Sequence, residues 1–163
     1  MLKEGSAAPK FSASDQHGNI VELDDLAGKW VALWWYPKAS TPGWTLEGGG
    51  FRDRTLEFEA LNAVIIGASF DTVEEQKVFA DSQGYEFSLL SDPDRVMGTA
   101  YEATRPPDHP FVSLPERITY LISPDGLIAR AYDPSSAASL DEHPDQLLKD
   151  IEELSWETVH FKD

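Results

Sequence analysis

Residues 36–53 hold the side chains and the backbone pattern most suited to chemistry. The stretch begins where an apolar run, residues 30–36, indicates a buried strand, and it leads into residues 51–61, whose apolar spacing is typical of one helix face. A strand that ends at Pro37 and turns into a helix presents main-chain N–H groups around position 44. Helix N-termini stabilise anions and lower the pKa of thiols, so a reactive thiolate belongs at this position. The residue there is Trp44.

This stretch resembles the active-site segment of the peroxiredoxins (AhpC/TSA type), in particular the peroxiredoxin Q (bacterioferritin comigratory protein) group. The segment of that group reads Pro-x-x-x-Thr-x-x-Cys, with a second cysteine five residues further along the helix. Pro37 and Thr41 match the first two signature positions, while Trp44 stands at the peroxidatic cysteine and Gly49 at the resolving cysteine. The resemblance spans nearly the whole chain and continues in Phe51-Arg52-Asp53, in residues 66–71, in residues 89–92 and in Arg117 ahead of residues 119–122.

The resemblance implies an α/β protein with a thioredoxin-like fold, in which helices flank a central mixed sheet and a hairpin extends the N-terminus. It also implies roles for three residues. The Thr41 hydroxyl and the helix amides would hold the peroxide oxygens, Arg117 would stabilise the thiolate and the leaving oxygen, and Pro37 would shield the site from water. Two simpler interpretations stay open: Thr41 as a helix cap, and Arg117 as one half of a surface salt bridge.

Trp44 cannot replace a thiolate, because indole has one N–H donor, no acceptor and no nucleophilic electron pair at neutral pH. Three interpretations of Trp44 remain: a core side chain that fills the peroxide space, an aromatic group that contacts a ligand, or an artefact of decoding. The three glycines at 48–50 have two interpretations. They are either a relic of the helix unwinding that lets two cysteines pair, or a sign that the helix starts only near Phe51.

Composition limits the remaining function classes. The 163 residues and 41% hydrophobic content predict one domain over residues 1–163, and residues 30–36 are too short to span a bilayer. No apolar leader follows Met1, so a cytoplasmic location is expected.

The net charge of −16 disfavours nucleic acid and membranes as partners. It is interpreted as a solubility surface or, alternatively, as an acidic patch for a basic partner.

The chain contains no cysteine, which excludes disulfides, thiolate metal sites and cysteine nucleophiles. The four histidines lack ligand spacing, and residues 141–145, which include His143, are interpreted as a solvated acidic helix start. We therefore expect no metal and no cofactor. The expected partners are a small oxyanion or peroxide at the vestigial pocket, and the chain is expected to be a monomer or weak homodimer.

The order of predicted elements agrees with the fold that the resemblance implies. A helix is expected to begin at Asp71 with Glu74 in capping-box spacing, and a last helix is expected to have Pro144 as its first residue. Prolines make residues 104–115 irregular. The other expected elements are a hairpin at 11–13 and 20–23, a helical turn at 24–28, strands at 30–36, 63–68 and 86–90, a helix at 94–103, a hairpin at 117–123 and 127–132, and the last helix at 144–155.

The sequence therefore predicts a peroxiredoxin-like protein without peroxidase chemistry, a pseudo-enzyme with a binding or structural role. The family is a thiol-dependent peroxidase family, but this chain has no nucleophile of that kind. The alternative is a thiol peroxidase for hydrogen peroxide and alkyl hydroperoxides, seen in altered form. A third hypothesis is a structural or chaperone-like module that works through its acidic surface.

Overall fold

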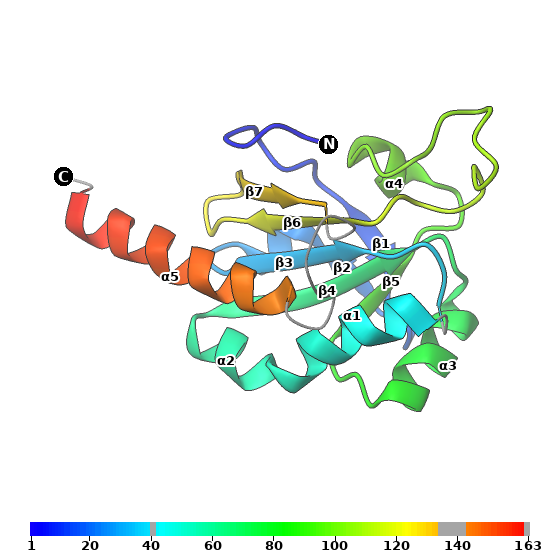
Figure 1. Ribbon diagram of the computed structural model, residues 1–163, viewed down its shortest axis with the longest axis horizontal. Coiled ribbons are helices and arrows are strands. Elements are labelled where there is room, and N and C mark those ends of the chain that lie inside the picture. Colours follow the sequence, from blue (N-terminus) through cyan, green and yellow to red (C-terminus); the bar gives the residue numbers. More distant parts are fainter. Residues whose placement is uncertain (40–41, 134–142, 162–163) are drawn as a thin grey trace.

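The computed structural model describes residues 1–39, 42–133 and 143–161, with the side chains at 42–46 and 158–161 left out. The sheet has seven strands in the order β2-β1-β5-β4-β3-β6-β7, and Figure 1 shows the helices packed around it. The strands are β1 Ser12–Ser14, β2 Ile20–Glu22, β3 Trp30–Trp35, β4 Ala63–Ser69, β5 Ser88–Ser91, β6 Ile118–Ile122 and β7 Ile128–Tyr132. The helices are the 3-10 turn η1 Leu23–Leu26, α1 Pro42–Asp53, α2 Thr55–Ala60, α3 Val73–Gln83, α4 Val96–Ala100 and α5 His143–Phe161.

Strand β3 is an interior strand of the sheet, next to the middle strand β4. It pairs in parallel with β4 on one side and antiparallel with β6 on the other. All six of its residues are buried, as expected for an apolar strand that is covered on both faces. The prediction of an interior strand at residues 30–36 is confirmed.

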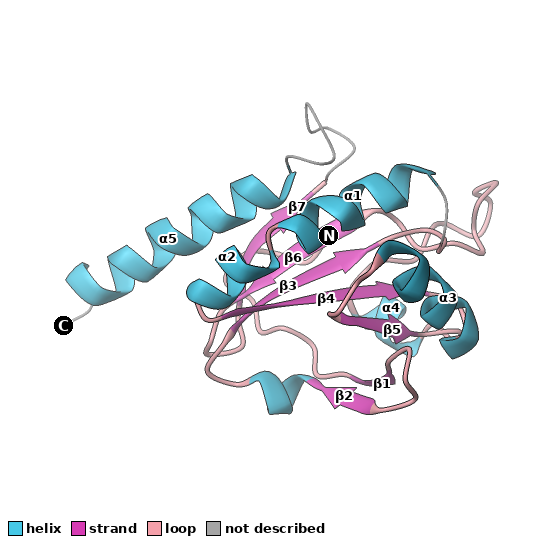
Figure 2. Ribbon diagram, turned by 90° about the horizontal axis from the view of Figure 1, so that it is seen from below, coloured by secondary structure: helices cyan, strands magenta, loops and turns pink. Residues whose placement is uncertain are grey.

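Alternate residues of β3 enter two separate hydrophobic clusters, one on each face of the sheet. Trp34 packs with aromatic and aliphatic side chains of α1, α2, α3 and α5, such as Phe51 and Leu147. Trp35 packs on the opposite face with Tyr101 and Tyr120. Figure 2 shows α1, α2 and α5 running along the first face, where α1 packs beside α5.

The predicted N-terminal hairpin is present, and β1 and β2 pair antiparallel. The turn between them is held by Asp15, whose Oδ1 accepts hydrogen bonds from the amides of His17 (2.9 Å) and Asn19 (3.0 Å). Gly18 has a φ of +80°, which favours glycine. The buried Gln16 then joins the hairpin to the main sheet, because its side-chain amide hydrogen-bonds to the backbone of Phe87 and Leu89.

The N-cap of helix α3 lies one residue later than predicted. Its N-cap is Thr72, whose hydroxyl accepts a hydrogen bond from the Glu75 amide while the Glu75 carboxylate accepts one from the Thr72 amide. The prediction that Asp71 and Glu74 form the capping box is therefore wrong. The Asp71 side chain instead takes part in a buried network described below.

Helix α1 runs through the three glycines, so the prediction of a helix that starts only near Phe51 is wrong. Packing explains one of them. A Cβ at Gly48 would lie 2.2 Å from the Tyr85 hydroxyl and 2.9 Å from the Trp34 ring, so only glycine lets α1 approach this close. At Gly49, the nearest atom to an added Cβ is 3.5 Å away, on the side chain of Arg52.

Several other helix and strand boundaries differ from the predicted ones by one to six residues. The helix predicted at 94–103 is the five-residue α4, and the last helix begins at His143 rather than at Pro144. The segment between α4 and β6 contains no helix or strand, as its prolines predict. No helix within the described ranges is both long and apolar enough to cross a membrane.

Candidate functional site

The predicted site residues lie at the carboxyl end of β3 and in α1. Pro37 is buried directly after Tyr36, and Trp44 lies in the first turn of α1. Gly49 is buried in the middle of the same helix. Thr41 lies outside the described residues, and so does the side chain of Trp44.

A buried polar network holds the loop between β3 and α1. The Ala39 amide donates to Asp71 Oδ2 (2.8 Å), and the Ser69 hydroxyl donates to the same oxygen (2.6 Å). Gln76 donates to Ser69 Oγ (2.8 Å) and accepts a hydrogen bond from the Tyr36 hydroxyl. The loop geometry is thus fixed by the end of β4 and by α3, with no contribution from a cysteine.

Arg117 reaches this region because it directly precedes β6. The first residue of β6, Ile118, lies opposite Trp35 at the end of β3, so Arg117 is placed beside the carboxyl end of β3. Burial lowers the pKa of Arg117, while the negative charges of Glu47 and Asp133 act in the opposite direction. A functional role for Arg117 at this position stays a prediction.

Glu47 is the most unusual residue of the site. It follows Trp44 by three positions on α1 and its side chain is 0% exposed. Among the described residues, neither carboxylate oxygen has a hydrogen-bond partner. Burial raises the pKa of Glu47 from its usual 4.5 to about 8, although the positive charge of Arg117 opposes this rise. Glu47 is therefore mostly a neutral carboxylic acid at pH 7.

His143 is the second unexpected member of the site. It is only 6% exposed and packs edge-on against Phe51 (ring centroids 6.0 Å apart) and Tyr132 (5.4 Å). Its Nε2 atom is buried without a hydrogen-bond partner in the described ranges. Burial, together with the positive charge of Arg117, lowers the pKa of His143 from its usual 6.5 to about 4. The imidazole is therefore neutral at pH 7.

The interpretation of residues 141–145 as a solvated helix start is consequently wrong for His143. It holds for Asp145, which is exposed and forms a salt bridge with Arg54 (2.6 Å). Residues 141 and 142 lie outside the described part of the chain.

The helical spacing of the sequence indicated that both Glu47 and His143 lie on buried helix faces. Glu47 precedes the buried Phe51 by four positions, and His143 precedes the buried Leu147 by four. Residues four apart share one face of a helix, so both polar side chains fall on a buried face.

The site therefore combines a guanidinium, a neutral carboxylic acid and a neutral imidazole between α1, β6 and α5. Such a set can attract and hydrogen-bond an anion or a polar ligand, but it offers no thiolate to attack one. The described residues contain no group of three or more histidine or acidic side chains suited to a metal ion.

The fold and this site define a peroxiredoxin scaffold. The AhpC/TSA family model matches residues 5–131, so the chain belongs to that family. Its relatives place it among the peroxiredoxin Q and bacterioferritin-comigratory-protein members, which confirms the resemblance seen in the sequence.

Three relatives show the extent of the similarity. Peroxiredoxin Bcp from Escherichia coli (strain K12) is 33% identical over 165 residues, which cover 93% of this chain and 97% of that protein. The crystal structure of peroxidoxin BcpB from Mycobacterium tuberculosis has a TM-score of 0.85 at 30% identity, over 94% of this chain and 99% of the other. Bacterioferritin comigratory protein from Xanthomonas campestris has a TM-score of 0.84 at 30% identity, with the same coverage of both chains. The thioredoxin-like fold is thereby confirmed.

Proposed function

We propose that this protein is a peroxiredoxin-like pseudo-enzyme, a peroxidase-inactive scaffold with a binding or structural role. One observation carries the proposal: position 44 is tryptophan, position 49 is glycine, and the chain has no cysteine that could act in their place. Peroxide reduction in this family needs a thiolate, and no other side chain of the site supplies an equivalent nucleophile.

The binding role that we propose is the retention of a small oxyanion or peroxide near Arg117. Because Glu47 is mostly protonated at neutral pH, its charge does not cancel that of the guanidinium. The network through Asp71 and Ser69 holds the loop ahead of α1 without any sulfur contact. Both features support an anion-binding site that is retained although the chain has no cysteine nucleophile.

The proposal extends to the setting of the protein. It is a cytoplasmic monomer or weak homodimer, and its partners include neither nucleic acid nor membranes. The net charge of −16 supports the second part, because it repels phosphate backbones and anionic lipids.

A peroxidase assay tests the loss of activity. Hydrogen peroxide and an alkyl hydroperoxide are supplied with a dithiol or with thioredoxin and its reductase, and their consumption is followed. We expect a rate no higher than that of a cysteine-free protein of similar size, while a cysteine-containing peroxiredoxin in the same assay is active. A saturable rate that depends on the reductant would refute the pseudo-enzyme.

The second candidate is a thiol peroxidase whose sequence is recorded in altered form. Its relatives are peroxiredoxins, and a Cβ added at Gly49 would meet only the Arg52 side chain, at the ordinary contact distance of 3.5 Å. Cysteine codons differ by one base from those of tryptophan and glycine, and the selenocysteine codon differs by one base from that of tryptophan. The native gene at codons 44 and 49, together with the intact mass of the protein from its source, distinguishes this candidate from the first.

A further inference from the structure

An open strand edge lies at the end of the sheet opposite to the candidate site. Strand β4 begins at Ala63, but β5 begins only at Ser88, which lies opposite Ile66. The first three residues of β4, 63–65, therefore have β3 on one side and, among the described residues, no paired strand on the other.

The ladder with β3 shows which main-chain groups face the open side. The carbonyls of Asn62 and Ala68 accept hydrogen bonds from the amides of Trp30 (3.0 Å) and Tyr36 (3.1 Å), so the even-numbered residues of this segment face β3. Main-chain groups alternate in direction along a strand. The amides of Ala63 and Ile65 consequently face the open side, where β5 has not yet begun.

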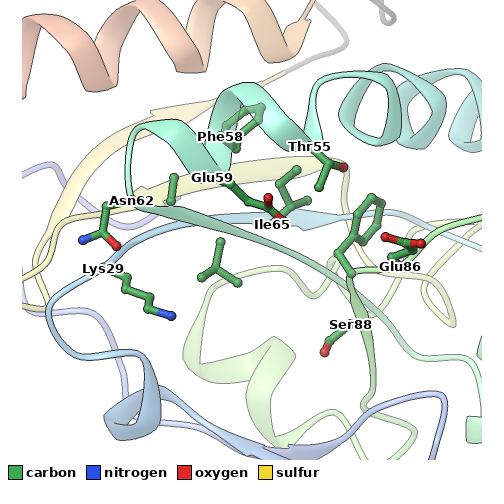
Figure 3. Close-up of a pocket in the computed structure, with 11 residues that line it drawn as sticks. Lys29, Thr55, Phe58, Glu59, Asn62, Ile65, Glu86 and Ser88 are labelled. Atoms are coloured by element: carbon green, nitrogen blue, oxygen red, sulfur yellow. The ribbon is translucent and has the colours of Figure 1, made fainter.

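A cavity of about 490 Å³ lies beside this open edge, within the usual size range of small-ligand sites. Its inner wall is apolar, formed by the buried Phe58, Ile65 and Phe87. Its polar members are Lys29, Thr55, Glu59, Asn62, Glu86 and Ser88. Figure 3 shows these side chains around the cavity, with those of the α2 end on one side and those of the β5 start on another.

The charges around the cavity are separated. In Figure 3 the ammonium of Lys29 points into the cavity from one side, Glu86 lies on the opposite side, and Glu59 points inward from the end of α2. In the described part of the chain, no ion pair joins Lys29, Glu59 or Glu86 to another side chain. One positive and two negative groups are thus available to a ligand, with apolar surface and an open strand edge between them.

We propose that this cavity binds a short peptide of two or three residues with free termini. The peptide carboxylate pairs with Lys29, and its ammonium group lies between Glu59 and Glu86. The carbonyl of the peptide bond accepts a hydrogen bond from the amide of Ala63 or Ile65 at the open edge of β4, as in β-strand addition, and an apolar side chain packs on Phe58 and Phe87. A simple anion would meet two carboxylates here, and a simple cation would leave Lys29 without a partner.

Binding is tested by NMR with the full ¹⁵N-labelled chain and the dipeptide alanyl-leucine as the probe. We expect saturable shifts centred on the amides of Ala63 and Ile65, while the amide of Ala39 at the candidate site stays unchanged. The capped analogue N-acetyl-alanyl-leucine amide has the same side chains but no charged ends. We expect it to bind at least about fivefold more weakly.

Two variants test the roles of the charges. Lys29→Met and Glu86→Gln are each expected to weaken alanyl-leucine binding about fivefold. The matched controls Lys77→Met and Glu74→Gln remove the same charges from the exposed face of α3 and should leave the affinity unchanged. Equal affinity for the capped and free peptides, shifts centred elsewhere, or no saturation at millimolar peptide would each overturn the proposal.

Discussion

At the scale of single residues, the site depends on Glu47, which is a buried carboxylic acid beside a guanidinium. A buried acid without hydrogen-bond partners destabilises its own ionised form, and this explains both its raised pKa and its neutrality at pH 7. The neutral His143, which also experiences the charge of Arg117, adds no charge to the site. Arg117 is therefore the main source of charge in this group of three.

Glu47→Gln is expected to change how stability depends on pH. Between pH 4.5 and about 8, Glu47 is ionised in the unfolded chain but protonated in the folded one, so folding loses stability as the pH rises through this window. Glutamine removes that loss. The stability of the variant relative to the parent should thus grow from pH 5 to pH 8 and then level off, by an amount on the order of 3–5 kcal/mol.

Urea unfolding of both proteins at pH 5, 6, 7, 8 and 9 measures this difference. His143 affects both proteins alike: its lowered pKa costs stability as the pH falls from 6.5 towards 4, and it cancels in the comparison. Parallel pH profiles for the parent and Glu47→Gln would show that Glu47 ionises normally in the folded protein.

Arg117→Met tests the anion site. Sulfate binding, followed by NMR shifts of the amides in α1, should weaken at least about tenfold in this variant, because the charge-assisted hydrogen bonds are lost. In the parent, binding should also weaken as the pH rises through about 8, since ionised Glu47 then offsets the guanidinium.

Two controls define the result for sulfate. Arg130→Met removes the same charge from β7 and should leave sulfate binding unchanged, and Glu47→Gln should abolish the weakening above pH 8. Sulfate binding that survives Arg117→Met would place the anion elsewhere.

At the scale of elements, the packing of α1 against the sheet decides what its glycines do. Gly48 is confined by Tyr85 and Trp34, two large aromatic side chains that also pack against one another. Gly49 has room for a side chain beside Arg52. Glycine is thus required by packing at position 48, whereas at position 49 it only lowers the stability of the helix.

The pair Gly48→Ala and Gly49→Ala separates these two effects. We expect Gly48→Ala to lose about 1–3 kcal/mol through overpacking, and Gly49→Ala to gain up to about 1 kcal/mol because alanine favours the helix. Thermal and urea unfolding at pH 7 measure both. If both variants gained stability alike, the tight contact at Gly48 would be disproved.

At the scale of the whole molecule, the chain keeps the fold of its peroxiredoxin relatives although it contains no cysteine. Hydrogen bonds from the end of β4 and from α3 hold the loop ahead of α1, and the pairing of β6 with β3 positions Arg117. None of these contacts involves position 44 or 49, so the framework does not depend on either sulfur.

The double variant Trp44→Cys, Gly49→Cys tests whether the framework still supports chemistry. We expect the thiol at position 44 to have a pKa at least about one unit below the free value of 8.5, and peroxide turnover with a dithiol to appear. Thiolate absorbance as a function of pH and the peroxidase assay measure these outcomes.

The thermal midpoint of the double variant is the control. If Trp44 has become a core element, its removal costs roughly 3–5 kcal/mol and the midpoint falls. A stable double variant with an ordinary thiol pKa would show that Arg117 and the start of α1 no longer form a reactive site.

The sequence by itself determined the fold and the lack of thiol chemistry. The apolar run at 30–36 can be stable only as an interior strand, and the absence of cysteine is a property of composition that no folding can change. The signature positions Pro37, Thr41, Trp44 and Gly49 were likewise recognisable because they lie close together in the chain.

Only the tertiary structure decided which distant residues meet. Glu47, Arg117 and His143 come from three elements, and they approach one another because β6 pairs with β3 and α1 packs beside α5. The open edge of β4 likewise depends on where β5 begins to pair. Hydrophobic periodicity reports local structure and burial, but pairing register and helix packing are set by long-range contacts, and these contacts determine which buried groups lack partners and which pKa values shift.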